Sequence, residues 1–176
     1  MIKTTRLHLL PMGPAHLADL AEMNADPDVM VHFPDVMTRA QSEAHLGRIQ
    51  AHWETHDFGL FALIRKADHA FLGFTGLTRP GYETPFTPCV EVGWRMHRAA
   101  WGMGYAHEAA TACLHWGFTT LGLPEIVSFT ARENTRSIAL MRRLGMQTAP
   151  ADDFEHPMLA KGHRLSWHVL YRLQRP

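Results

Sequence analysis

The sequence predicts a mixed α/β fold with a partly antiparallel sheet, and three observations support this fold class. Strands in the first half follow one another as a meander, whereas strands and helices alternate in the second half. The chain has 176 residues, of which 46% are hydrophobic and 19% charged, which is a globular composition. It contains no internal repeat, low-complexity tract or linker, so residues 1–176 are expected to form one domain.

The first three elements are a short strand and two helices. Thr5–Leu10 alternates leucine with polar residues and is closed by a proline, which indicates a strand. Pro14–Ala25 carries apolar residues at helical spacing and is followed by Asp26-Pro27, a helix stop. Arg39–His56 places Leu46, Ile49 and Trp53 on one helical face, which predicts a second helix.

A hairpin, a loop and a third strand follow. Phe58–Arg65 and Phe71–Thr78 are apolar, aromatic runs separated by Lys66-Ala67-Asp68-His69, so we expect two paired strands. Gly81–Pro88 contains two prolines and is expected to be a loop. Cys89–Met96 is interpreted as the next strand.

The second half alternates helices with strands. The expected helices carry apolar residues at helical spacing and end at glycines, and the expected strands are rich in β-branched and aromatic residues. In order, the elements are a helix at Tyr105–Leu121, a strand at Glu125–Thr130, a helix at Asn134–Leu144, a loop at 149–165 and a strand at Trp167–Leu173.

Charge and composition exclude several function classes. Lys and Arg total 17, and Asp and Glu also total 17, so the chain lacks the basic excess that nucleic acid or an anionic membrane requires of a partner. Two cysteines do not make a disulfide scaffold. No segment has the roughly 20 apolar residues of a membrane span, and no signal peptide is evident. We therefore expect a cytoplasmic protein.

The most informative segment is a strand, a short glycine turn and a long helix. The strand Val90–Met96 leads to the turn Trp101–Ala106, which opens the helix. Such a turn exposes backbone N–H groups at the positive end of the helix dipole, which suits a pyrophosphate, although an ordinary helix start explains two glycines equally well. The dinucleotide-binding pattern fails because position 107 is His107, and the phosphate-loop pattern fails because Gly104 is followed by Tyr105.

A resemblance decides between these readings. The stretch Trp101–Ala109 resembles the signature of the GNAT superfamily of N-acetyltransferases, closest to the branch with the ribosomal-protein N-terminal acetyltransferases. Thr5–Leu7, Phe71–Leu77 and Asn134–Met146 resemble three further segments of that branch. The resemblance runs from Thr5 to Tyr171. It implies a GNAT fold, with a mixed, mostly antiparallel central sheet flanked by helices.

The same resemblance implies acetyl-CoA as co-substrate and assigns residues to it. The pantetheine arm would pair with the backbone around Trp94 and Met96, and Asn134 would hydrogen-bond the arm near the thioester. A Gln or Arg that the family carries ahead of the turn is Trp101 here, so the phosphates would depend on backbone amides and on Arg98. The amides that would bind the pyrophosphate belong to Gly102, Met103, Gly104, Tyr105 and Ala106.

The catalytic groups are less clearly marked. Glu91 lies mid-strand where several relatives keep a base or a water-holding carboxylate, and a structural carboxylate is the equally weighted alternative. The frequent proton donor of the family, a tyrosine seven residues after the asparagine, is Met141 here. Ser137 or an ordered water would fill that role, and a thiol with a pKa of about 8.5 leaves readily without strong help.

These residues favour an enzyme that moves an acetyl group from acetyl-CoA to a primary amine by direct attack. Because an α-amino group has a pKa of about 7.7–8.0 and a lysine amine about 10.4, we expect α-amino acceptors on peptides or amino-acid-like molecules. The alternative is a catalytically silent CoA-binding or protein-interaction domain, suggested by Met141. A binder of another phosphorylated ligand and a homodimer also stay open.

The acceptor and metal interpretations depend on weaker patterns. Phe33-Pro34 and the segments 80–88 and 149–163 are candidates to line the acceptor site. His52 and His56 are one helical turn apart, a spacing that can bind metal, but no third ligand is evident and no metal is expected. A local acidic pocket would require several carboxylates to gather, namely Glu83, Glu91, Asp152, Asp153 and Glu155.

Overall fold

A computed structural model describes residues 1–176 and shows a nine-stranded sheet. Eight strands follow the order β1-β2-β3-β4-β5-β6-β9-β7, and β8 pairs with β9. Only β5 and β6 are parallel, so the expected mixed, mostly antiparallel sheet is confirmed. The strands are β1 (Ile2–Lys3), β2 (Leu7–Pro11), β3 (Leu60–Arg65), β4 (Phe71–Thr78), β5 (Glu91–Met96), β6 (Glu125–Ala131), β7 (Gln147–Thr148), β8 (Phe154–Glu155) and β9 (Trp167–Gln174).

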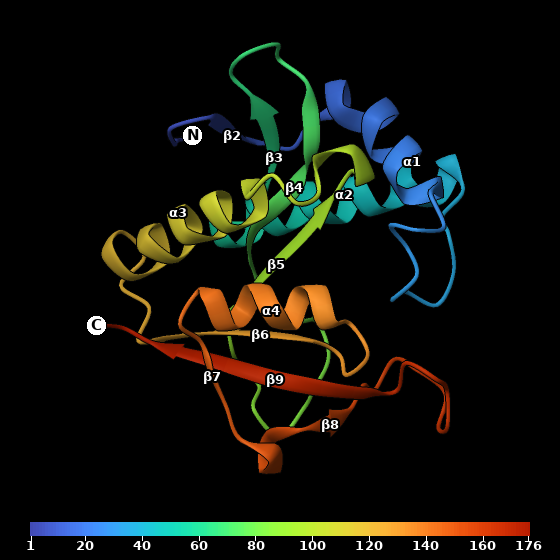
Figure 1. The fold of residues 1–176 in the computed structure, drawn as a ribbon, viewed down its shortest axis with the longest axis vertical. Coiled ribbons are helices and arrows are strands. Elements are labelled where there is room, and N and C mark those ends of the chain that lie inside the picture. Colours follow the sequence, from blue (N-terminus) through green and yellow to red (C-terminus); the bar gives the residue numbers. More distant parts are fainter.

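Four α-helices cover the sheet (Figure 1). Helices α1 (Leu17–Ala25) and α2 (Arg39–His56) enclose one apolar cluster with β3 and β4. Helices α3 (Tyr105–Thr119) and α4 (Thr135–Arg143) contribute to a larger cluster on the other face. The two clusters together give the sheet a buried layer on each side, as the apolar periodicity requires. None of the helices is both long and apolar enough to cross a bilayer.

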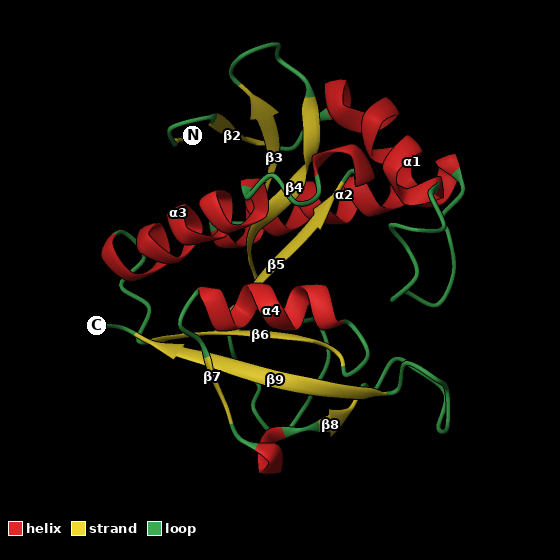
Figure 2. Ribbon diagram, viewed as in Figure 1, coloured by secondary structure: helices red, strands yellow, loops and turns green.

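The parallel pairing between β5 and β6 is very short. Glu91 opposite Val127 is its only register position, with the N–H of Val127 donating to the carbonyl of Val90 at 2.9 Å. Beyond this point the strands run in different directions, and α4 lies where they diverge (Figure 1). Figure 2 shows the resulting division into β1–β5 and β6–β9. The divergence leaves backbone groups of β5 without a neighbouring strand.

The sequence misplaced some boundaries and missed the shortest elements. The strand expected at Thr5–Leu10 is β2, which begins only at Leu7 because a turn precedes it, in which the N–H of Thr4 donates to the carbonyl of Leu7. Pro11 is the last residue of β2 and does not lie outside it. The expected loop 149–165 contains a short 3-10 helix and β8. Two-residue strands such as β1, β7 and β8 are too short to show an alternating pattern, and only their pairing partners define them.

Candidate active site

The glycine turn before α3 presents a row of free backbone donors. Gly102 and Gly104 have φ of +74° and +78°, which side chains rarely adopt. None of the N–H groups from Gly102 to His107 donates to another protein group, and the first bond of the helix is from Glu108 to Gly104 at 3.1 Å. Gly104 caps α3 without a side-chain hydrogen bond. These amides are therefore available to an anion, at a helix N-terminus whose dipole favours one.

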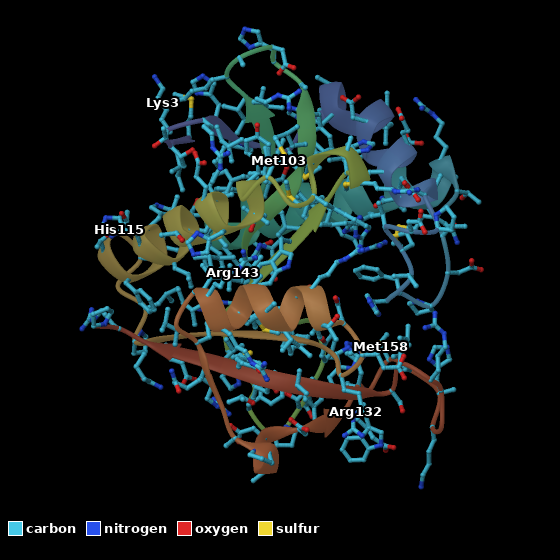
Figure 3. The ribbon with its side chains drawn as sticks, in the orientation of Figure 1. Lys3, Met103, His115, Arg132, Arg143 and Met158 are labelled. Carbon is cyan, nitrogen blue, oxygen red and sulfur yellow. The ribbon has the colours of Figure 1, made fainter.

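The turn is held from outside by Arg6. Its guanidinium donates to the carbonyl of Met103 at 2.9 Å, pairs with Glu108 at 2.6 Å and lies 4.3 Å from the centre of the Tyr105 ring. Burial acts against ionisation of Glu108, but hydrogen bonds from Thr4 and Arg6 outweigh it and hold its pKa below the usual value. Met103 itself is 55% exposed, and Figure 3 labels it at the start of α3. Glu108 therefore serves the turn as a structural carboxylate.

Two arginines near the turn differ in availability. Arg98, which the sequence suggested for the phosphates, forms an ion pair with Asp28 at 2.5 Å. Arg136, in the first turn of α4, lies 4.3 Å from the centre of the Trp101 ring and has no carboxylate partner. The Trp101 indole N–H donates to the carbonyl of Met96 at 3.0 Å. Arg136 was missed because only the folded chain brings it to the turn.

Trp94 faces the divergence between β5 and β6. Backbone groups alternate between the two edges of a strand, and the carbonyl of Val90 points to β6, so those of Trp94 point the same way. The Met96 carbonyl, on the same edge, is occupied by the Trp101 indole. Of the two residues predicted to pair with pantetheine, Trp94 therefore has its backbone free. Its indole donates across the gap to Oγ of Ser137 at 3.2 Å.

The side chain of Asn134 caps α4. Its Oδ1 accepts from the N–H of Ser137 at 3.2 Å, and its Nδ2 donates to Oγ1 of Thr130 at 2.9 Å. An amide has a second donor and a second lone pair, so these bonds leave half of its capacity free. Met141, at the position where relatives carry tyrosine, is fully buried and packs with the α3 cluster.

Glu91 lies where β5 and β6 part. Its side chain is on the face of β5 opposite α3 and α4, shared with Gly93, and its carboxylate forms no hydrogen bond or ion pair. The residue keeps some exposure, yet burial of the carboxylate raises its pKa to about 8. A carboxylate that structurally pinned the strand would have a partner, and this one has none. Glu91 is thus an unpaired carboxylate at the point where the two strands part.

An aromatic and histidine cluster that the sequence did not indicate lies near Glu91. The Tyr82 hydroxyl is 2.9 Å from Nε2 of His156, whose ring centre is 4.8 Å from that of His168. Burial, and then the charge of Glu91, raise the pKa of Tyr82. Burial lowers the pKa of both histidines, to about 4 for His168. The expected loops 80–88 and 149–163 therefore do meet beside Glu91.

The metal site and the acidic pocket that the sequence suggested are not formed, because their residues make other contacts. His52 uses Nδ1 with the carbonyl of Phe58 at 2.8 Å and Nε2 with the N–H of Arg79 at 2.9 Å, so neither nitrogen is free for a metal. The acidic pocket is not formed by the group suggested, because Asp152 pairs with Arg172 and Asp153 approaches Arg132 at 4.0 Å. A hollow of about 430 Å³ adjoins Asp152 and contains none of the predicted site residues; its lining is Gln147, Thr148, Ala149, Asp152, Arg172, Leu173 and Gln174.

A family model described as an acetyltransferase (GNAT) domain matches residues 6–147. The chain belongs to the GNAT acetyltransferases. The FsC-acetyl coenzyme A-N(2)-transacetylase of Aspergillus fumigatus is 30% identical over 152 residues, 82% of this chain and 64% of that protein. The chain thus spans less than two thirds of this relative.

Solved structures share the GNAT fold over nearly the whole chain. A GNAT-family acetyltransferase from Bacillus anthracis has a TM-score of 0.80 at 23% identity, covering 99% of this chain and 98% of that one. The ribosomal alpha-N-protein acetyltransferase RimL, in complex with coenzyme A, has a TM-score of 0.77 at 14% identity (97% and 95% covered). The spermidine N-acetyltransferase from Vibrio cholerae, in complex with CoA and spermine, has 0.76 at 16% (97% and 96%). The resemblance seen in the sequence is confirmed.

Proposed function

We propose that this GNAT acetyltransferase, as one domain of residues 1–176, transfers an acetyl group from acetyl-CoA to an α-amino group by direct attack. The observation that carries the proposal is Glu91, an unpartnered carboxylate with a pKa of about 8 at the point where β5 and β6 part. The free amides of the turn lie at the other end of the same strand. One strand thus connects an anion-binding turn to an acid–base group.

The residues present fit acetyl-CoA, which supplies the acetyl thioester. The N–H groups of the turn from Gly102 to Ala106 would receive the pyrophosphate, because they have no protein partner and a Cβ at Gly102 would meet no atom within 4 Å. The free backbone of Trp94 would pair with an amide of the pantetheine arm. Asn134 would contribute its spare donor and lone pair.

Glu91 would take the proton that the acceptor amine loses. In the transfer, the amine nitrogen forms a bond to the carbonyl carbon, the carbon–sulfur bond breaks, and the nitrogen releases one proton. A base works best when its pKa lies near the working pH, and about 8 meets this condition for an α-amine. Gly93 leaves space beside it, since a Cβ there would meet nothing closer than Oε1 of Glu91 at 3.9 Å.

The departing thiolate needs a proton, and Ser137 is the side chain we assign to it. Its Oγ accepts from the Trp94 indole at 3.2 Å, which leaves the hydroxyl hydrogen free to donate. Met141 is buried in the core and carries no acidic hydrogen. Because the thiol pKa is about 8.5, this assistance contributes less than the base does.

The acceptor assignment is tested with two peptides of matched sequence. One has a free N-terminus and no lysine, and the other has a blocked N-terminus and one lysine. We expect the first to have the larger kcat/KM, because a far greater fraction of its amine is neutral near pH 7. Faster acetylation of the blocked lysine peptide would overturn the α-amino assignment. Tight CoA binding without release of free CoA from any amine would favour the silent domain instead.

A further inference from the structure

A buried arginine without a countercharge lies two residues beyond Gly93. Arg95 is only 8% exposed, and no carboxylate lies within 4.0 Å of it. Its Nη1 donates to Oδ1 of Asn24 at 2.5 Å, its Nη2 donates to no protein group, and its Nε is fully buried without an acceptor. Removing an ion from water costs several kcal/mol unless it is paired, so this cation lacks a partner that burial demands.

The surroundings of Arg95 offer aromatic faces and neutral polar atoms only. Its guanidinium lies 4.0 Å from the ring centre of Phe33 and 5.3 Å from that of Phe74. His45 packs edge-on against Phe74, and its Nδ1 is likewise buried without a partner. Burial, followed by the charges of Arg95 and Arg48, lowers the pKa of His45 to about 4, so it is neutral near pH 7. The missing negative charge is therefore not supplied by the chain.

We call the face of β5 that carries Glu91, Gly93 and Arg95 the acceptor face. Arg95, Gly93 and Glu91 are opposite Phe74, Gly76 and Thr78 of β4, so their side chains alternate to the same face. The sheet over Gly93 is uncovered, because a Cβ there would have Glu91 as its nearest neighbour at 3.9 Å. Side chains two residues apart on one face are separated by roughly 7 Å. Glu91 and Arg95 are two such steps apart, so about 13 Å of strand, with Gly93 midway, separates the acid–base group from the unpaired cation.

The segments bordering this face add positive charge. Phe33 belongs to the α1–α2 connection, and the carbonyl of neighbouring Val31 accepts from Nη2 of Arg164 at 2.9 Å. Burial lowers the pKa of His32, and the charges of Arg164 and Arg136 lower it further, while Glu133 opposes them. Neither Arg164 nor Arg136 has a carboxylate partner. Arg164 and Arg136 therefore place two unpaired positive charges beside this face.

We propose that Arg95 binds a carboxylate of the acceptor, so the substrate class is an amine that carries a carboxylate several atoms away. This inference rests on the proposed function, with Glu91 receiving the amine proton and Arg95 holding the far end. The carboxylate would occupy the open donors of the guanidinium, which suit the geometry of a carboxylate. A short peptide with a free carboxyl group has this chemistry.

The test compares the tripeptide glycyl-glycyl-glycine with the same tripeptide carrying a carboxamide in place of its carboxyl group. Calorimetry on the CoA-saturated protein measures binding, and kcat/KM per neutral amine measures acetylation. We expect the acid to bind at least tenfold more tightly than the amide, equivalent to about 1.4 kcal/mol. In Arg95→Gln the acid should lose this advantage, with amide binding unchanged. Arg175→Gln, which removes an exposed arginine after β9 that has no assigned role, should leave both affinities as they are.

The two readouts separate this inference from the proposed function. Equal binding of acid and amide, or of neither, to the wild-type protein overturns the carboxylate site even if Arg95→Gln fails to fold. An equal loss of both affinities in a folded Arg95→Gln protein shows that the arginine is only structural. Selective binding of the acid without release of free CoA supports the site and contradicts the acetyl transfer.

Discussion

The two regions near the ends of β5 to which we assign functions are formed by different kinds of groups. The turn at Gly102–Ala106 presents backbone amides from consecutive residues, and its main external support is Arg6. The acceptor face around Glu91 combines side chains from β5, α1, α2 and three connections, which include Asn24, Phe33 and Tyr82. Anion binding by backbone N–H groups is compatible with many side chains in the turn. Binding at the acceptor face depends on each of the side chains that form it. A single substitution should therefore have sharply different consequences at the two ends.

The largest expected effect is on the rate at the acceptor face. Glu91→Gln should lower kcat/KM for a peptide N-terminus by about a hundredfold or more, since general base catalysis contributes about 10²–10⁴. Affinity for CoA should stay nearly unchanged, because the lost group serves chemistry. Glu83→Gln, an exposed acid in the preceding loop, is the matched control and should keep the wild-type rate. Full turnover of Glu91→Gln across pH 6 to 9 would make the carboxylate structural.

At the turn, the expected effect is on binding. Gly104→Val introduces a side chain at φ +78°, strains the backbone by about 1–2 kcal/mol and blocks the approach of a phosphate to the amides. Calorimetry should show CoA affinity falling at least tenfold, about 1.4 kcal/mol. Gly122→Val supplies the matched strain at φ +66° beyond the far end of α3, in open space. Equal losses of CoA affinity in both variants would show that strain, not the turn, is responsible.

The sequence was enough to predict the whole turn but only part of the acceptor face, because the turn is contiguous in sequence and the face is not. Trp101–Ala106 is contiguous, so its glycines and the following helix are visible in order, and the resemblance to the family confirmed the fold they belong to. Glu91 was named from its place in the same stretch. Arg95 gives no local signal, because its lack of a countercharge depends on Asn24 and Phe33, about 60 to 70 positions earlier. The Tyr82–His156 contact likewise spans 74 positions.

The smallest expected effect is on the pH dependence of stability. It reports burial of the Glu91 carboxylate independently of any catalytic role. The folded-state pKa of about 8 exceeds the usual 4.5, so between these values the folded protein binds this proton more tightly than the unfolded chain does. Stability contributed by the protonated carboxyl is therefore present below about pH 4.5 and lost as pH rises through 8. Gln at this position does not titrate and keeps the neutral form throughout.

The difference in Tm between Glu91→Gln and wild type should consequently be small at pH 5, grow with rising pH and level off above about pH 8. Because Glu91 keeps some exposure, we expect an increase of a few degrees, corresponding to about 1 kcal/mol for a domain of this size. Thermal melts of the ligand-free proteins in matched buffers provide the measurement, and Glu83→Gln should show no such trend. A constant difference from pH 5 to 9 would mean that the carboxylate is as well solvated folded as unfolded. In that case Glu91 would be an ordinary surface acid, and its assignment as a base with a raised pKa would be wrong.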